Sequence, residues 1–355
     1  MKKRFVTDAE EFLAENMNQE ASWPRMTRKL PAVAPGRRVF VWGDLAVELT
    51  VSFDAPLRPE LLARWRTGDE PGCRCEIRKP SLGGFVGKAV PIAAELGCNV
   101  GIACAVSLPA PDLIRTFLEC GRFDSQHVVA CPGPTPLELR LQFTDCSVRL
   151  SHPGITAQIR PQIPARLRDH FDAVLIDPGS PDGRPERLKS LVQSCNRETS
   201  GVPLGIVGRR DWSAADLEIL AGQRAWLFLA DREVVQLVDR LKGREQVAGV
   251  REAMIELKRR LGPDVRLVVT RGAGGAWLMN GLPQPEPCAP CGTASTSRLS
   301  AHTAAQPVVL AAYTLLGSMA GLSDQAATRM GLNSIMHRRA GISRLPHAAT
   351  IEETA

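Results

Sequence analysis

Charged residues and glycines occur together at two places in the first third of the chain. Asp44 and Glu48 follow a short apolar segment, and Lys88 lies one helical turn after Gly83 and Gly84. A carboxylate accepts protons and hydrogen bonds, whereas an ammonium only donates hydrogen bonds. Glycine lets the backbone approach a neighbouring group or a ligand closely. Taken alone, each of these local patterns is a weak signal.

Two further groups lie in the second half of the chain. Glu233 comes three residues after Ala230, at the end of an apolar segment, and Thr270 is followed by Gly272 and Gly275. Glycines in such a segment either allow close approach to a bound ligand or form a tight turn between two strands. The residues alone leave both interpretations open.

The elements that must position these residues alternate between strand and helix patterns. We expect strands at 39–42, 45–53, 100–106, 173–176, 204–207, 225–229, 265–270 and 275–279, a hairpin or meander at 137–150, and helices at 84–96, 111–120, 184–196, 214–220, 231–241, 245–261, 308–319 and 324–336. This alternation predicts an α/β protein with a mostly parallel sheet covered on both faces. Ligands in such sheets bind beyond the carboxyl ends of the strands.

Taken together and in this order, the four groups resemble the motifs of the ribokinase/PfkB family of carbohydrate and nucleoside kinases. The resemblance implies a three-layer α/β/α sandwich with a small β-sheet lid over the sugar site. The expected organisation is an N-terminal extension over 1–38 with a short helix at 7–18 and a linker, a ribokinase-like domain over 39–345 with lid segments near 50–80 and 137–150, and a tail over 346–355.

On the substrate side, the resemblance implies that Asp44, Glu48, Gly83, Gly84 and Lys88 contact the ligand. The family has Asp at the position of Glu48 and Asn at that of Lys88, and both contact sugar hydroxyls. An ammonium cannot accept a hydrogen bond, so a neutral polyol would be bound differently here. Lys88 would suit an anionic group, pair with an acid or reach solvent.

On the nucleotide side, the resemblance implies contacts from Glu233, Thr270, Gly272, Gly275 and Asn333. ATP and Mg²⁺ would be the cosubstrate and metal of an active enzyme. The family carries Asn-x-x-Glu to organise the metal and the phosphates, but Ala230 stands at the Asn position here.

The motif that supplies the family's catalytic base is missing. Family members carry Gly-Ala-Gly-Asp at the start of a late helix, and this position falls near Gln306, Pro307 and Val308. The segment from Pro287 through Ser323 contains neither Asp nor Glu, so no shift in alignment supplies a carboxylate. A general base is typically worth ~10²–10⁴-fold in rate. His302 is the only nearby substitute, and a loop histidine is its ordinary interpretation.

The cysteines and histidines do not form a convincing metal site. Cys73 and Cys75 form one close pair and Cys288 and Cys291 another, but they lie far apart in the chain and Cys-x-Cys is poor zinc spacing. We interpret them as unrelated thiols, with a redox role for Cys288 and Cys291 as the lesser alternative. No metal ligands are predicted.

Charge and hydropathy exclude several classes of protein. Most of the net charge of +6 lies at the two ends of the chain, so the body lacks the basic cluster of a nucleic-acid-binding face. No apolar segment approaches the ~20 residues that span a bilayer. Asp8, Glu10 and Glu11 interrupt the beginning of the chain, which argues against a signal peptide. We therefore expect a cytoplasmic protein that binds neither nucleic acid nor membrane.

Three functional hypotheses follow. The first is a ribokinase-like pseudokinase with a scaffold or regulatory role, bound to a protein partner or paired through its lid in a homodimer. The second is an active sugar or nucleoside kinase that uses ATP and Mg²⁺. The third is a sensor that binds a nucleotide or an anionic sugar without turnover.

Overall fold

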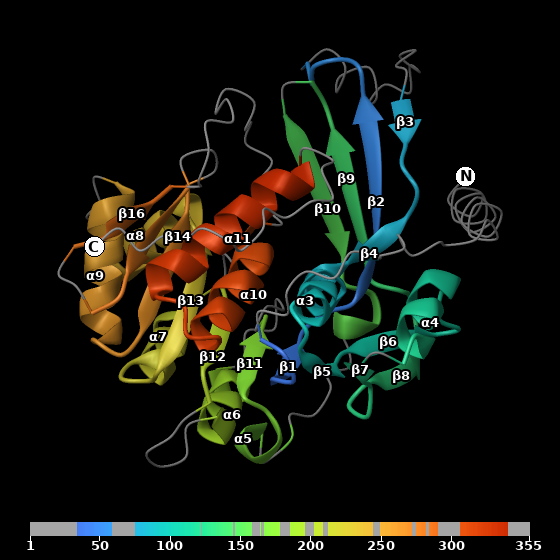
Figure 1. Ribbon diagram of the computed structural model, residues 1–355. Coiled ribbons are helices and arrows are strands. Elements are labelled where there is room, and N and C mark those ends of the chain that lie inside the picture. Colours follow the sequence, from blue (N-terminus) through green and yellow to red (C-terminus); the bar gives the residue numbers. More distant parts are fainter. Residues whose placement is uncertain are drawn as a thin grey trace.

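The computed structural model shows a central sheet between two layers of helices, with a second sheet standing at one side (Figure 1). The residues that the structure describes are 34–58, 75–121, 123–144, 146–157, 164, 167–177, 185–195, 202–208, 212–243, 249–271, 275–281, 284–289 and 306–339. The expected helix at 7–18, most of the N-terminal extension and the C-terminal tail lie outside these residues.

The main sheet has nine strands in the order β16-β15-β14-β13-β12-β11-β1-β5-β7. Their bounds are β1 (Arg38–Trp42), β5 (Asn99–Ala103), β7 (Phe123–Asp124), β11 (Ala173–Ile176), β12 (Leu204–Val207), β13 (Ala225–Ala230), β14 (Arg266–Thr270), β15 (Ala276–Met279) and β16 (Glu286–Cys288). The strands from β7 to β14 in this order are parallel, whereas β15 and β16 add antiparallel pairs at one edge.

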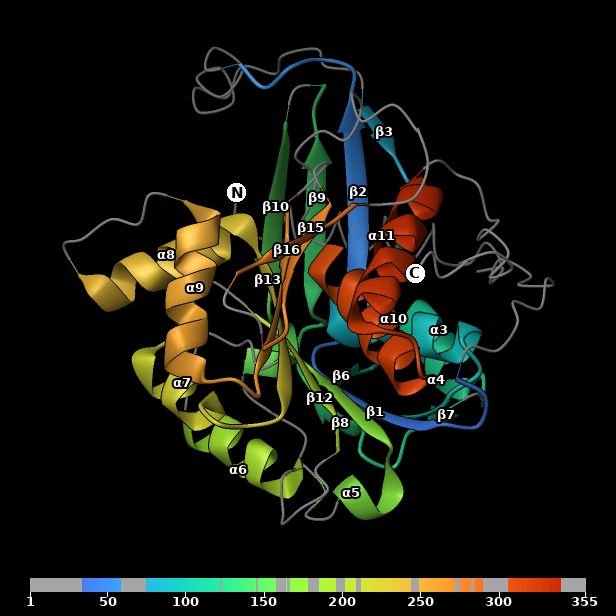
Figure 2. The same cartoon turned by 60° about the vertical axis from the view of Figure 1, so that its left-hand side comes forward.

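Helices cover both faces of the main sheet because its strands are apolar on both sides. In β1, Val39 and Val41 face one core, whereas Phe40 and Trp42 face the other. The first core is covered by α3 (Gly84–Glu95), α4 (Asp112–Glu119), α10 (Gln306–Met319) and α11 (Asp324–Arg339), and the second by α5 (Leu167–His170), α6 (Pro185–Cys195), α7 (Ala214–Leu220), α8 (Asp231–Lys242) and α9 (Val250–Leu261). Figure 2 shows these two layers on opposite sides of the strands.

The second sheet, here called the lid sheet, has the strand order β10-β9-β2-β3, and β4 also pairs with β2. Its strands are β2 (Ala46–Phe53), β3 (Cys75–Ile77), β4 (Ser81–Gly83), β9 (Leu137–Gln142) and β10 (Ser147–His152). β2 continues the chain directly from β1, and β4 leads directly into α3. The lid sheet is therefore anchored to the main body at the carboxyl end of β1.

The three-layer sandwich with a mostly parallel sheet and a small second sheet is the architecture predicted from the sequence. One expected element differs: the apolar segment 100–106 is not one strand. It divides at Cys104 into β5, in the main sheet, and β6 (Ala105–Leu108), which pairs with β8 (Val129–Pro132) in a separate two-stranded sheet. A continuous apolar segment carries no periodicity that marks where the chain leaves one sheet for another.

The start of one helix and two strands at the edges of the main sheet also differ from the expectation. The helix expected from residue 245 begins at Val250, and 244–248 lie outside the described residues. The short strands β7 and β16 extend the two edges of the main sheet and have no clear pattern in the sequence. None of the helices in the described part of the chain is long and apolar enough to cross a membrane.

Candidate functional site

The strand order of the main sheet reverses between β1 and β11. The chain runs from β1 outward to β5 and β7 and then returns to β11 on the other side of β1. Open α/β sheets bind ligands at such a switch point, beyond the carboxyl ends of the strands. Asp44, Glu48 and the lid sheet follow β1 at this point, so the fold places these predicted ligand-contacting residues at the position that sheet topology favours.

Asp44 caps the helix that follows the lid strand β4. Its carboxylate oxygen Oδ1 accepts a hydrogen bond from the backbone N–H of Phe85 at 3.0 Å, and its carbonyl oxygen accepts one from Val86 at 2.9 Å. A negative charge at the N-terminus of α3 also interacts favourably with the helix dipole. Asp44 thus joins the β1–β2 connection to the first turn of α3.

The glycines around Asp44 are required by close backbone packing. Gly84 has a positive φ of +71°, and a Cβ there would lie 2.5 Å from the carbonyl oxygen of Asp44. A Cβ on Gly83 would lie 2.9 Å from that of Glu48. These contacts account for both residues without a ligand, because only glycine lets the start of α3 approach the β1–β2 connection so closely.

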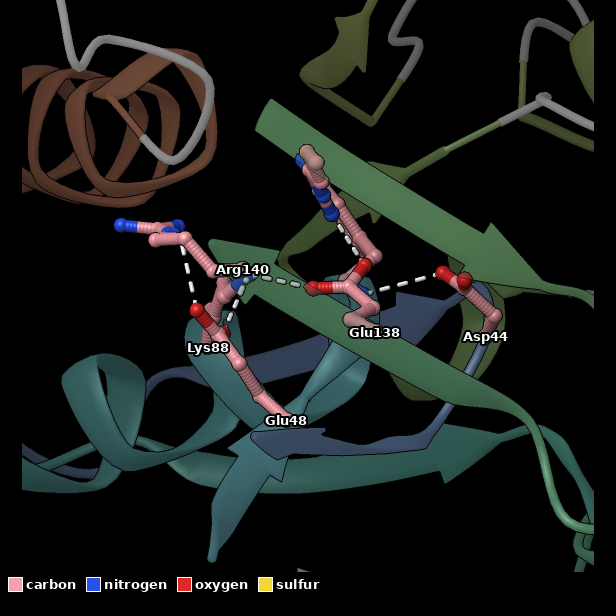
Figure 3. A network of polar contacts seen from close by, with 7 residues as sticks. Asp44, Glu48, Lys88, Glu138 and Arg140 are labelled. Carbon is pink, nitrogen blue, oxygen red and sulfur yellow. Dashed lines mark hydrogen bonds and ion pairs between the residues drawn. The ribbon is translucent and has the colours of Figure 1, made fainter. Parts of the chain in front are cut away.

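Lys88 lies between two carboxylates from the lid sheet (Figure 3). Its Nζ atom is 3.0 Å from Glu48 Oε2 on β2 and 2.9 Å from Glu138 Oε2 on β9. The other carboxylate oxygens are also paired: Arg140 Nη2 is 3.0 Å from Glu48 Oε1, and Arg149 Nη2 contacts Glu138 Oε1. We call these five residues the lid network, and it connects α3 to three strands of the lid sheet.

The strand register explains why these charges meet. Glu48 and Glu138 are direct partners across β2 and β9, and Arg140 and Arg149 are direct partners across β9 and β10. Like charges directly opposite one another destabilise a sheet. Here each arginine pairs diagonally with a glutamate, and Lys88 bridges the two glutamates from the helix. The network therefore depends on α3 as well as on the lid sheet.

Both glutamates are buried, and each is paired with cations. Burial by itself raises the pKa of Glu138, but the Lys88 ammonium and the Arg149 guanidinium more than offset this effect and hold the pKa below its usual value. Buried charges of this kind are stable only when they are paired. All four carboxylate oxygens of Glu48 and Glu138 have a cationic partner. A neutral polyol would have to share these oxygens with the cations that already contact them.

The residues expected on the nucleotide side also have partners within the protein. The Glu233 Oε2 atom accepts a hydrogen bond from the backbone N–H of Ala230 at 2.8 Å, so it caps the start of α8. The buried Thr270 hydroxyl lies 3.5 Å from the carbonyl oxygen of Leu229. Asn333 lies half-buried on α11, and Gly272 lies outside the described residues.

Gly275 has a structural explanation of its own. Its φ is +85°, and a Cβ would lie only 2.3 Å from the carbonyl oxygen of Cys288 on β16. Its carbonyl oxygen accepts a hydrogen bond from Arg271 N at 2.8 Å, which closes the connection between β14 and β15. Of the two interpretations of this glycine-rich segment, the tight turn accounts for Gly275.

The first turn of α10 contains Gln306, Pro307 and Val308 and no acidic residue. α10 packs against α3 and against β11, β12 and β13, so it belongs to the layer that borders the switch point. The next acid along the chain is Asp324, which pairs with Arg266 at 3.3 Å. α10 has 14 residues, so at a rise of 1.5 Å per residue it is about 21 Å long. Asp324 comes after the C-terminal end of this helix, whereas the resemblance places the catalytic carboxylate at its N-terminal end.

One buried acid at the switch point has no clear signal in the sequence. Asp177 directly follows β11, the strand beside β1, and its backbone N–H donates to the carbonyl oxygen of Trp42 at 3.0 Å. Asp177 and Asp44 thus lie at the carboxyl ends of adjacent strands. His302, the substitute base considered from the sequence, lies outside the described residues.

Glu138, Arg140 and Arg149 were also not identified as site residues from the sequence. They alternate with apolar residues such as Leu139, a pattern equally typical of a strand whose polar face meets solvent. Only the pairing of β9 with β2 shows that this polar face meets Lys88.

The cysteines retain the ordinary interpretation. Cys75 is exposed and Cys288 is buried, and burial raises the pKa of the Cys288 thiol to about 11. Cys73 and Cys291 lie outside the described residues. Within the described ranges, no group of three or more His, Cys, Asp or Glu side chains is arranged to hold a metal ion.

Comparison with known proteins identifies the fold. No family model and no curated protein matches the sequence. Among solved structures, the ribokinase of Thermotoga maritima is 15% identical with a TM-score of 0.63, over 88% of this chain and 94% of that one. A nucleoside kinase from Burkholderia thailandensis, in complex with inosine, is 17% identical with a TM-score of 0.62, over 84% and 92%. The ribokinase of Arabidopsis thaliana, complexed with ribose and ATP, is 16% identical with a TM-score of 0.60, over 84% and 91%.

These matches cover 84–88% of this chain. The chain therefore has the ribokinase-like fold, and the fold class predicted from the sequence is confirmed. At these identities the likeness concerns the fold, and the chemistry must be argued from the residues of this chain.

Proposed function

We propose that this protein is a ribokinase-fold pseudokinase with a scaffold or regulatory role. The observation that carries the proposal is the start of α10, where the resemblance implies an anion hole and a catalytic carboxylate. The first turn of this helix has no acid, and the sequence has no Asp or Glu from Pro287 through Ser323. A helix starts at the expected place, but it lacks the group that would accept the hydroxyl proton.

The substrate side supports the same conclusion. A sugar kinase must leave acceptors available for the hydroxyl groups of its substrate, because polar specificity rests on such hydrogen bonds. Here each carboxylate oxygen of Glu48 and Glu138 already contacts a cation, so a sugar hydroxyl would compete with that cation for it, and Asp44 uses one oxygen to cap α3. The residues that would bind the sugar therefore serve to hold the lid sheet against the body.

The described residues of the nucleotide side fit Mg²⁺ and ATP poorly. Ala230 has no oxygen in its side chain to hold a hydrated metal, and the Glu233 carboxylate is engaged at its own helix start. Loss of a general base costs ~10²–10⁴-fold and loss of anion-hole donors ~10²–10³-fold. Together these losses would leave phosphoryl transfer far below the usual range for a kinase.

A coupled phosphotransfer assay with ATP and Mg²⁺ over a panel of sugars and nucleosides tests the proposal. We expect turnover well below the ordinary enzyme range, and a value above roughly 1 s⁻¹ would contradict the pseudokinase assignment. If turnover is found, Asp177 is the candidate base, because it is a buried carboxylate at the switch point beside Asp44. Asp177→Asn should then abolish turnover. Asp172→Asn, just before the N-terminal end of β11, should leave turnover unchanged.

The proposed scaffold role needs a surface for a partner, and the lid sheet supplies a candidate. On the face opposite the lid network, alternate residues of each strand are apolar and only partly buried. They are Leu49, Val51, Ile77, Leu139, Leu141, Val148 and Leu150. Such a face suits a second copy of this chain or an apolar protein partner.

A further inference from the structure

We infer that Arg140 and Arg149 form a binding site for a small molecule that carries a carboxylate or phosphate group. The inference goes beyond the proposed loss of phosphoryl transfer and does not depend on it, because binding can be measured without ATP. It rests on the register, the charge balance and the unused donors of the lid network.

The register brings the two guanidinium groups to the same face of the lid sheet. Arg140 on β9 and Arg149 on β10 are direct cross-strand partners. Two like charges in this arrangement repel one another. Among the described residues, Arg140 has the single carboxylate partner Glu48 and Arg149 the single carboxylate partner Glu138. Both of these carboxylates are shared with Lys88. An anion between the arginines would relieve their repulsion.

The charge balance of the lid network points the same way. Lys88, Arg140 and Arg149 contribute three positive charges, and Glu48 and Glu138 contribute two negative charges. One positive charge is left over, and it lies on the arginine side, because Lys88 is the cation that contacts both glutamates. A ligand with one negative charge would complete the network.

The arginines also have donors available for a ligand. A guanidinium has five N–H donors in a planar fork, and the ion pairs above use only the Nη2 atom of each arginine. Their other nitrogens have no partner among the described residues. The side chains are 23% exposed for Arg140 and 35% for Arg149, so a solute can reach them. Paired N–H donors of this geometry match carboxylate and phosphate oxygens.

Calorimetry and thermal-shift measurements on the full chain test the inference, with inorganic phosphate and gluconate as anionic probes and glucose as the neutral comparison. We expect saturable binding of at least one anion and none of glucose. Binding of phosphate alone, of gluconate alone or of both would show whether the site accepts a phosphate group, a carboxylate group or either. Absence of saturable binding of both anions at millimolar concentrations would overturn the inference.

Two variants connect binding to the arginines. Arg149→Gln should weaken binding of the anion about tenfold or more, because the substitution removes a pair of charge-assisted N–H donors. Arg140→Lys keeps the charge beside Glu48 but loses the planar fork, so it should weaken binding without the instability that loss of a buried partner brings. Arg115→Gln, at an exposed ion pair on α4, is the matched control and should leave binding unchanged. Equal binding by all three variants would overturn the inference.

Discussion

At the scale of single residues, Lys88 makes structural contacts at a position where the resemblance implies a ligand contact. The resemblance places a sugar-contacting Asn there, but the ammonium of Lys88 instead bridges Glu48 and Glu138. These two carboxylates lie directly opposite one another in a buried position, and Lys88 is the cation that contacts both. Of the three alternatives open at the sequence level, the structure selects pairing with an acid.

Lys88→Met should destabilise the protein by about 3 kcal/mol, the cost of leaving buried charges with too few partners. Chemical denaturation measures this change in the free energy of unfolding. The double variant Lys88→Met/Glu138→Gln should recover part of the loss, because one of the opposed charges is removed. Lys189→Met, at an exposed position on α6, is the control. A loss no larger than that of the control would show that the bridge contributes little.

At the scale of elements, α3 and α10 begin with different kinds of residue. α3 begins with two glycines and receives a carboxylate cap from Asp44. α10 begins with Gln306 and Pro307, and proline suits a first turn because its missing N–H would have no partner there. Both helices occur where the fold requires them, but only α3 keeps the glycines of its motif.

Gly84→Ala should cost more stability than Gly222→Ala, although both glycines have nearly the same φ, +71° and +72°. A Cβ on Gly222 meets open space, so that variant bears only the strain of a positive φ, about 1 kcal/mol. At Gly84 the Cβ clashes with the backbone carbonyl of Asp44 as well. Denaturation midpoints give the comparison, and equal losses would show that this clash is relieved by a small shift of α3.

At the scale of the whole molecule, the two faces of the lid sheet differ in chemistry. One face carries the lid network toward α3, and the other is apolar and only partly covered. The network connects the lid sheet to α3 through Lys88. Under the proposed scaffold role, the apolar face would be the surface that docks a second copy or a partner.

If the apolar lid face pairs two copies, Leu150→Glu should convert a dimer to a monomer in sedimentation velocity experiments. Leu150 is 51% exposed on this face, and a charge there could not be buried without a partner. Leu108→Glu is the control, since Leu108 is 49% exposed but lies on β6, outside the lid sheet. A wild-type protein that is monomeric at all concentrations would contradict homodimerisation and leave a different partner as the occupant.

Much of the architecture follows from local pattern. Apolar segments such as Val39–Trp42 and Ala173–Ile176 are buried on both faces, and strands of this kind alternate with amphipathic helices, so the parallel sheet is predictable. The candidate site was predictable only in part. Asp44, Glu48 and Lys88 follow recognisable glycine-rich motifs, but Arg149 and Asp177 have no motif and enter the site through strand pairing.

The sequence by itself determined the α/β class of this protein and the absence of a carboxylate before the late helix, because periodicity and composition are local properties of the chain. Only the tertiary structure decided what the remaining polar residues do. Whether Lys88 meets a ligand, solvent or an acid depends on the register of β2 against β9, which brings Glu48 opposite Glu138. Such contacts join residues distant in the chain, so no local pattern determines them.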